Sequence, residues 1–216
     1  MNPAAAPGPQ RIERVRTEGT FSIDGEDFHV ENNIWLVGDD ERVVVIDAAH
    51  HAAPIIDAAG GRQVVMILAT HGHNDHINAA VELAEAVHAP IALHPDDRHL
   101  WDMVHPRRAP DLALTDDQEI SFGSHRLRVF HTPGHSPGGV CVVVMGERVV
   151  FSGDTLFAGG PGATGRSWSS FEVIIESIRR RLLTLPAETV VHTGHGDDTT
   201  IGAEAPHLDE WLRRGH

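Results

Sequence analysis

Short apolar runs bounded by turn residues recur along the first half of the chain, and they predict β-strands. The segments 21–30, 33–37 and 43–47 have this form, and we expect them to make two or three antiparallel strands. The segment 63–70 is continuously apolar at its centre, which is typical of a strand buried on both faces.

Apolar residues at helical spacing predict helices at 78–87, 169–183 and 207–214. Ser169 or Ser170 is the expected N-cap of the second helix. Further short strands are expected at 91–93, 126–130, 139–145, 148–151 and 189–191. Strands interspersed with helices predict a layered α/β fold, in which helices cover the outer faces of sheets. The longest stretch without a regular pattern, 94–114, is expected to form a rim or a lid.

The composition restricts the classes of protein that the chain can belong to. Its 216 residues fit one domain, expected at residues 11–216 after a disordered tail rich in Ala, Pro and Gly at residues 1–10. One cysteine excludes a disulfide framework and a cysteine-rich metal site. The net charge of −14 argues against nucleic acid or an anionic membrane as a partner. The sequence has no apolar run near the roughly 18 residues of a membrane span and no signal-peptide pattern, so we expect a cytoplasmic protein.

Four potential metal ligands lie within six residues of one another, directly after the apolar segment 63–70. They are His71, His73, Asp75 and His76. Imidazole and carboxylate groups are ligands of zinc, iron and manganese. Because alternate residues of an extended stretch share a face, His71 and His73 can bind one ion, while the other two residues turn into a helix and reach a second.

Three further polar residues, His135, Asp154 and His195, each follow a predicted strand and lie beside glycine. Glycine lets the backbone approach a site closely, and the ends of successive strands can converge on one cleft. Together with the cluster they provide five His and two Asp, which suffice for two metal ions. The other twelve of the 17 histidines have no spacing that demands a ligand.

In this order and in these contexts, the seven residues resemble the ligand pattern of the metallo-β-lactamase superfamily. The resemblance extends over residues 33–202, and it is strongest to short hydrolases of the glyoxalase II type, through the segments 152–157 and 193–202. It implies a four-layer αββα sandwich of the metallo-β-lactamase type, with a dinuclear site along one edge of the two sheets.

The resemblance also implies a role for each residue. Carried over position by position, the first metal ion would be held by His71, His73 and His135. The second would be held by Asp75, His76 and His195, and Asp154 would bridge both. Zinc is the expected metal, with iron or manganese as alternatives. Asp47, at the end of the predicted strand 43–47, matches the acid that the family places under the site, where it would orient a ligand from behind.

The expected mechanism follows from charge. A water shared by two divalent cations loses a proton near neutral pH, since one zinc ion alone brings its pKa to about 7. The metal-bridging hydroxide would cleave a thioester of a small thiol, with Asp75 and Asp154 as the catalytic carboxylates. We expect a small-molecule thioester as the only partner, and a monomer or homodimer.

Departures from the family pattern restrict this activity. Dizinc β-lactamases of the common type place Cys where this chain has Asp154, which disfavours an antibiotic hydrolase. Longer glyoxalase II proteins bind glutathione with Lys and Tyr, and this chain contains neither. Arg166, in a glycine-rich loop, is the candidate for binding a substrate carboxylate instead.

Several alternatives remain open on the sequence alone. A persulfide dioxygenase-like oxidoreductase would keep many of these residues around one iron, and a lactone or carboxylester hydrolase would use the same site. Phosphodiester cleavage is disfavoured by the charge of −14. A metal-storage module is the weakest alternative, because two adjacent sites with a bridging Asp would activate a water.

Overall fold

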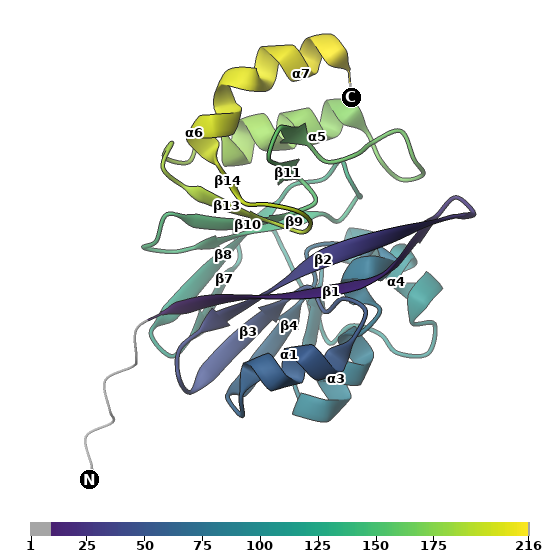
Figure 1. Cartoon of the computed structure of the whole chain (residues 1–216), viewed down its shortest axis with the longest axis vertical. Helices are drawn as coiled ribbons and strands as arrows, with labels where there is room; N and C mark the ends of the chain where they lie inside the picture. Colours follow the sequence, from purple (N-terminus) through teal and green to yellow (C-terminus); the bar gives the residue numbers. More distant parts are fainter. Residues whose placement is uncertain (1–9, 216) are drawn as a thin grey trace.

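Two six-stranded sheets lie face to face, and helices cover their outer sides (Figure 1). The computed structural model describes residues 10–215. The first sheet has the order β1 (Arg11–Ile23), β2 (Glu26–Gly38), β3 (Arg42–Ile46), β4 (Gln63–Leu68), β5 (Ile91–Leu93) and β6 (Leu112–Ala113). The second has the order β14 (Thr199–Thr200), β13 (Val190–Thr193), β10 (Val149–Gly153), β9 (Val140–Val144), β8 (His125–His131) and β7 (Glu119–Phe122). A separate two-stranded ribbon pairs β11 (Leu156–Phe157) with β12 (Gly160–Pro161).

Helices on the outer side of the first sheet alternate with its parallel strands. They are α1 (Ala52–Ala59), α2 (Asn74–Ile77), α3 (Ala80–Val87), the 3₁₀ turn η1 (Pro95–Asp97) and α4 (Arg98–Val104). The second sheet is covered by α5 (Phe171–Ser177), its π-helical continuation η2 (Ile178–Leu182), α6 (Ile201–Glu204), the 3₁₀ turn η3 (Ala205–His207) and α7 (Leu208–Arg214). Within residues 10–215, no helix is long and apolar enough to cross a membrane.

Strand β2 shows how the sequence specifies the layers. Its second half is buried on both faces. Side chains alternate between the faces of a strand, so Ile34 and Leu36 pack toward the first helical layer, whereas Trp35 and Val37 pack between the two sheets. A third apolar cluster joins the second sheet to α5 and α7. Helix, sheet, sheet and helix are therefore four packed layers, and the expected αββα sandwich is confirmed.

Some expected element boundaries are wrong. The segment 21–30 is not one strand, because the chain turns at Asp24 and Gly25 between β1 and β2. Both residues have positive φ, 52° and 78°, as a two-residue hairpin turn requires, and Asp-Gly is the usual sequence for it. The segment 94–114, expected to be irregular, contains α4, and the expected helix at 78–87 begins at Ala80. The N-cap is Ser170, whose hydroxyl accepts a hydrogen bond from Val173 N.

The expected N-terminal tail lies outside the described residues, except for Gln10. The Gln10 side chain lies 3.1 Å from His125 Nδ1. The opposite nitrogen of this imidazole lies 3.2 Å from Asp39 Oδ2, and Asp39 Oδ1 accepts hydrogen bonds from the backbone N–H groups of Glu41 and Arg42, both at 2.8 Å. Asp39 follows β2 and His125 begins β8, so this buried contact ties the turn between β2 and β3 to the second sheet.

Replacing Asp39 with Ala should lower the free energy of unfolding by about 1–3 kcal/mol at neutral pH, since it leaves the buried His125 ring and two partly buried backbone N–H groups without their partner. The backbone N–H groups of Glu41 and Arg42 hold the pKa of Asp39 below its ordinary value of 3.8. The stabilisation is therefore complete above that value and disappears as the pH falls through the lower pKa of the folded state. Urea unfolding of the metal-loaded protein over a series of pH values measures both effects.

Asp40→Ala is the matched control, because Asp40 pairs with Arg11 on the surface, where both side chains are about half exposed. An equal loss of stability in the two variants would contradict the assigned role of Asp39.

Candidate metal centre

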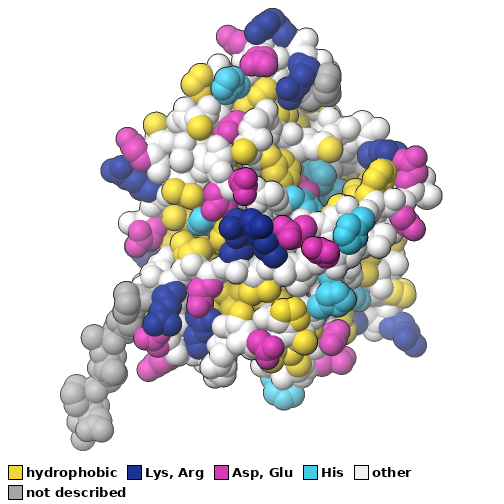
Figure 2. All heavy atoms as spheres, in the orientation of Figure 1, with side chains coloured by type: hydrophobic (Ala, Val, Ile, Leu, Met, Phe, Trp, Pro, Cys, Tyr) yellow, Lys and Arg dark blue, Asp and Glu magenta, His cyan; other side chains and the backbone are white. Residues whose placement is uncertain are grey.

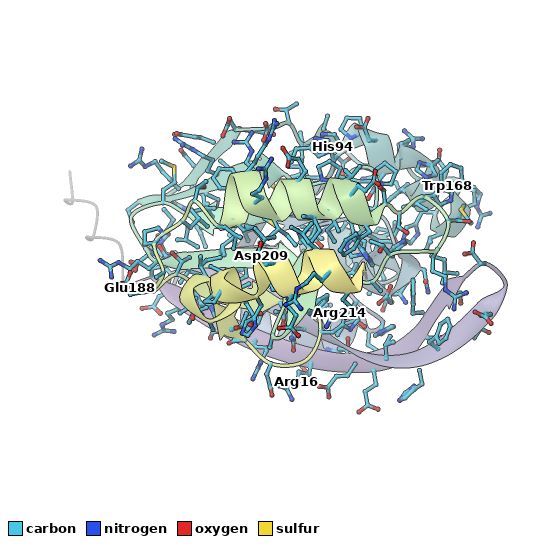
Figure 3. The ribbon with its side chains drawn as sticks, turned by 90° about the horizontal axis from the view of Figure 1, so that it is seen from above. Arg16, His94, Trp168, Glu188, Asp209 and Arg214 are labelled. Carbon is cyan, nitrogen blue, oxygen red and sulfur yellow. The ribbon has the colours of Figure 1, made fainter. Side chains whose placement is uncertain are left out.

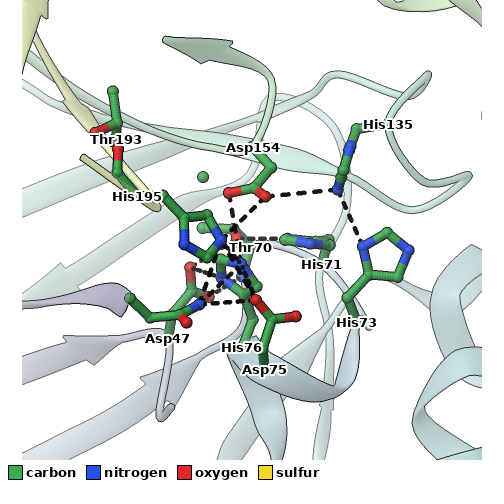
Figure 4. A network of polar contacts seen from close by, with 12 residues as sticks. Asp47, Thr70, His71, His73, Asp75, His76, His135, Asp154, Thr193 and His195 are labelled. Atoms are coloured by element: carbon green, nitrogen blue, oxygen red, sulfur yellow. Dashed lines mark hydrogen bonds and ion pairs between the residues drawn. The ribbon is translucent and has the colours of Figure 1, made fainter. Parts of the chain in front are cut away.

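Seven side chains from both sheets meet at one edge of the sandwich (Figure 4). The loop after β4 and the short helix α2 carry four of them, and the loops after β8, β10 and β13 carry one each. They are the seven residues that the sequence singles out: His71, His73, Asp75, His76, His135, Asp154 and His195. The structure thus brings together groups that are up to 124 positions apart, from 71 to 195.

The first group of ligand atoms belongs to His71, His73 and His135, and these atoms lie within 4.8 Å of one another. His73 Nδ1 lies 3.0 Å from His135 Nε2. The other nitrogen of the His135 ring lies 2.9 Å from the carbonyl oxygen of Ala163, which fixes the orientation of the ring.

The second group belongs to Asp75, His76 and His195. The Nε2 atoms of the two histidines are 3.2 Å apart, and they lie 3.5 and 3.3 Å from Asp75 Oδ2. A backbone carbonyl again holds one ring, since His195 Nδ1 lies 2.7 Å from Glu31 O.

Asp154 faces both groups. Its Oδ1 lies 3.4 Å from His76 Nε2, and its Oδ2 lies 3.4 Å from His195 Nε2 and 3.6 Å from His135 Nε2. This close approach needs glycine at position 194, because a Cβ there would overlap the Asp154 carboxylate and crowd the His76 ring. One carboxylate is therefore shared by two sets of potential ligands.

Unpaired buried atoms test whether these residues fit metal ions. His71 Nε2, His73 Nε2, Asp75 Oδ1 and Asp154 Oδ1 are buried without a hydrogen-bond partner among residues 10–215. Orphaned buried polar atoms are rare in native proteins, and a place for a bound ion is one recognised cause. Nitrogen and oxygen donors in sets of three, with a shared carboxylate, suit zinc, iron or manganese. The residues present fit two divalent metal ions.

The electrostatic field differs between the two groups. Burial lowers the pKa of His73 to about 3, and the pKa of His71 falls well below its usual value for the same reason, reinforced by the neighbouring histidines. Burial acts in the same direction on His195, but Asp154 and Asp75 outweigh it and raise its pKa to about 10. The pKa of His76 likewise rises well above the usual range, since three carboxylates more than offset its burial. The second group thus attracts positive charge, while the first offers neutral lone pairs.

Asp47 lies beneath the second group, as the resemblance implies. Its Oδ2 lies 2.9 Å from His76 Nδ1 and accepts a hydrogen bond from the Thr70 hydroxyl at 2.8 Å, while its Oδ1 accepts one from Thr70 N at 2.7 Å. The Thr70 hydroxyl also lies 3.0 Å from His71 Nδ1. Asp47 therefore fixes the ring of His76 directly and supports the orientation of His71 through Thr70.

Two residues that the sequence reasoning missed also support the site. The first is Asn32, which is fully buried in β2 and donates a hydrogen bond to Asp75 Oδ2 at 3.0 Å. Its Nδ2 lies 3.3 Å from His76 Nε2, and its Oδ1 lies 2.8 Å from His50 Nε2. The only feature of the sequence that could have indicated this role is a polar pair, Asn32 and Asn33, at the start of a buried apolar run.

The second missed residue is Asp97, which is fully buried and connects the two ligand loops of the first group. It accepts hydrogen bonds from Gly72 N at 2.7 Å, from the Ser136 hydroxyl at 2.7 Å and from Gly138 N at 2.6 Å. A Cβ at Gly138 would crowd Asp97, so a side chain here would displace the carboxylate. One side chain thereby spaces the His71–His73 loop from the His135 loop.

The other predicted residues have different surroundings. Arg166 is not grouped with the seven; its guanidinium pairs with Glu26 at 2.5 Å and lies over the Phe28 ring. Its expected role in binding a substrate carboxylate stays a prediction. Trp35 and Trp101 are buried in the core, whereas Met103 is exposed on α4.

The comparisons with known proteins agree with this site. A family model described as the metallo-beta-lactamase superfamily matches residues 29–195. The chain belongs to the metallo-β-lactamase superfamily, as the sequence resemblance predicts. Within that class it is a metal-dependent hydrolase, similar to the hydroxyacylglutathione hydrolase GloC of Haemophilus influenzae, with 31% identity over 81% of this chain and 90% of the relative.

Two solved structures share the fold at higher coverage. BLEG-1, described as a B3 metallo-beta-lactamase, has a TM-score of 0.75 and 30% identity over 89% of this chain and 98% of its own. TTHA1623, described in a di-iron-bound form, has a TM-score of 0.70 and 34% identity over 82% of this chain and 93% of its own. These names support a metal-dependent site, and the di-iron form of TTHA1623 is one example of iron on this fold. The metal of this chain stays open among zinc, iron and manganese.

Asp97→Asn should weaken metal binding at the first group by about 10- to 100-fold, the usual effect of losing a partner that orients metal ligands. The side-chain amide of Asn replaces one acceptor oxygen with an NH₂ group, which would face one of the three donors. The hydrogen bonds that hold the His71–His73 loop and the His135 loop at a fixed distance would then be incomplete. Competition with a chromogenic chelator measures the affinity, and elemental analysis measures the metal content per chain.

Asp102→Asn is the control, because the Asp102 side chain is 45% exposed, pairs with Arg98 and contacts none of the three donors. Unchanged affinity in the Asp97 variant would show that the loops hold their spacing without this carboxylate.

Proposed function

We propose that this protein hydrolyses the thioester of a small thiol at the seven-residue centre, with two divalent metal ions, zinc first among them. The observation that carries the proposal is the shared carboxylate of Asp154, which faces two complete sets of ligand atoms. The similarity to a hydroxyacylglutathione hydrolase supports the thioester class.

Metal ions bound here would supply a water of lowered pKa and an electrophile for the carbonyl oxygen. The chain's own residues position the reaction. Asp75 Oδ2 is held by Asn32 and lies close to His195, whereas Asp75 Oδ1 is unpaired within the described residues. The pKa of Asp75 is about 2, because His76 and His195 outweigh the effect of burial. Asp75 would therefore accept a hydrogen bond from the attacking water and orient it. A carboxylate with so low a pKa would be too weak a base to retain a proton taken from that water.

The leaving group fits the shortage of proton donors. A thiol has a pKa of about 8.5, so it departs as a thiolate with little help from an acid. The sequence contains no Lys and no Tyr, and Arg166 is paired with Glu26. An alcohol leaving group, as in a lactone or carboxylester, would need a proton, and the histidines of the site would not donate one while they hold metal ions.

Purified protein loaded with zinc, manganese or iron should hydrolyse thioesters, with two metal ions per chain. The panel contains S-lactoylglutathione, the acetyl thioester of N-acetylcysteamine, a lactone, a β-lactam and a persulfide with oxygen uptake recorded. Asp154→Ala should lower the rate by at least about 100-fold, because it removes a ligand from both groups. Asp209→Ala, an exposed acid on α7, is the control.

Turnover of the β-lactam alone, or oxygen uptake with the persulfide at one iron per chain, would overturn the thioester proposal. The first result would make this chain functionally similar to what BLEG-1 is described as.

A further inference from the structure

A pocket of about 200 Å³ opens beside the first group of ligands. Its inner end is formed by the metal-binding loop, at Gly72, His73 and Asn74. The other walls come from the β1–β2 hairpin, from α4 and from the loop before α5, and their apolar side chains are Ile23, Leu100, Met103, Val104 and Trp168. Three segments that are distant in the sequence thus build an apolar chamber that ends at a potential metal ligand.

Two large apolar side chains of this pocket are exposed. Met103 is 76% exposed and Trp168 is 58% exposed, although both could be buried at a favourable free energy. Trp168 lies at the edge of the molecule, beyond the end of α5 (Figure 3). Its φ is 69°, a backbone conformation that a bulky residue adopts only where its surroundings impose it. Its ring lies 4.5 Å from that of His99, so its position beside the pocket is defined.

The hairpin is fastened on both sides of the pocket. On the inner side, Ser22 N donates a hydrogen bond to Asn74 Oδ1 at 2.9 Å, and Asn74 Nδ2 donates one to Thr20 O at 2.7 Å. At the tip, Ser167 N donates one to Asp24 Oδ2 at 3.1 Å. These contacts hold the hairpin against the metal-binding loop and the loop before α5, so the pocket is preformed.

The charges around the pocket do not favour an anionic ligand. The residues that line it include no Arg, and the one carboxylate is that of Asp24. The nearby Arg166 is neutralised by Glu26 at 2.5 Å. On the face shown in Figure 2, basic and acidic side chains are interspersed. Along the outer part of the pocket, away from the metal centre, a carboxylate-bearing group would meet Asp24 and lose its water without gaining a free cation.

We propose that this pocket binds the acyl group of the substrate and makes the enzyme selective for thioesters of apolar acyl groups of about six carbons or one phenyl ring. An engineered apolar cavity of about 150 Å³ binds benzene, so a 200 Å³ pocket suits a group of this size. The thiol part of a cellular thioester carries polar groups, and these would lose their water in an apolar chamber. We therefore place the thiol part outside the pocket. This inference rests on the proposed thioesterase function.

The test is a series of N-acetylcysteamine thioesters with acetyl, butanoyl, hexanoyl, phenylacetyl and dodecanoyl groups. We expect kcat/KM to rise by up to about fourfold for each methylene that leaves water, until the pocket is full, and to level off or fall at dodecanoyl. In Met103→Glu and in Trp168→Ala the ratio of hexanoyl to acetyl kcat/KM should fall by about tenfold, because a charge enters the pocket or a wall is lost. A flat acyl series in the unmodified protein would overturn the proposal.

Leu212→Glu is the matched control, because Leu212 is 53% exposed on α7, outside the pocket. This variant should keep the acyl ratio of the unmodified protein. A ratio that falls equally in all three variants would assign the effect to general destabilisation and contradict the pocket.

A binding measurement separates failure of the pocket from failure of the proposed function. The thioether S-hexyl-N-acetylcysteamine has no carbonyl to attack, and its binding to the metal-loaded protein can be followed by NMR of methionine methyl groups. The Met103 signal should shift, whereas those of Met66 and Met145, which do not line the pocket, should not. Binding without hydrolysis of any thioester would reject the proposed function alone, and hydrolysis without a shift at Met103 would reject the pocket alone.

Discussion

The register between the two stacked sheets, that is, how far one is shifted over the other, is the constraint on which the rest of the structure depends. Neither sheet carries a complete set of potential ligands, since the loop after β4 and α2 supply four residues and the loops of the second sheet supply three. Backbone hydrogen bonds fix the register close to the site, from Val140 N to Thr70 O at 2.8 Å and from Asn33 N to Gly194 O at 2.7 Å. The indole of Trp35 adds another, to Thr193 O at 3.0 Å.

These cross-sheet contacts explain why so many polar groups can be buried in one place. A sliding of one sheet over the other would separate Asp75 from His195 and Asp154 from His76, and would leave buried carboxylates without these partners, at a high cost in free energy. In the observed register, each faces imidazole groups within about 3.5 Å. The apolar layer between the sheets and the polar edge thus require the same alignment.

The sequence predicts a layered α/β fold and the seven clustered residues because their information is local, whereas the αββα arrangement is implied by the family resemblance. A buried apolar strand followed by four ligand-type residues, and glycines beside three others, can be recognised without knowing the contacts. Asp97 and Asn32 could not be found in this way. Asp97 lies in an ordinary Asp-Asp pair at the start of a helix. Its structural role depends on hydrogen-bond donors that are 25 to 41 positions away in the sequence.

The missed hairpin has a different origin. Its Asp-Gly turn is a strong local signal, but the apolar residues Phe21, Ile23, Phe28 and Val30 continue on both sides and suggest one strand. Strand alternation identifies apolar positions without showing where the chain reverses. Boundaries that depend on one or two turn residues were therefore less predictable than the ligand cluster.

The loop around Asn74 has two structural roles: it carries potential metal ligands, and it holds the β1–β2 hairpin. Asn74 stands between His73 and Asp75, and its side chain holds the hairpin through Ser22 and Thr20. The segment that presents the potential ligands is therefore also the anchor of the hairpin that lines the neighbouring chamber. The geometry of the potential ligands and the shape of the neighbouring pocket therefore depend on one and the same side chain.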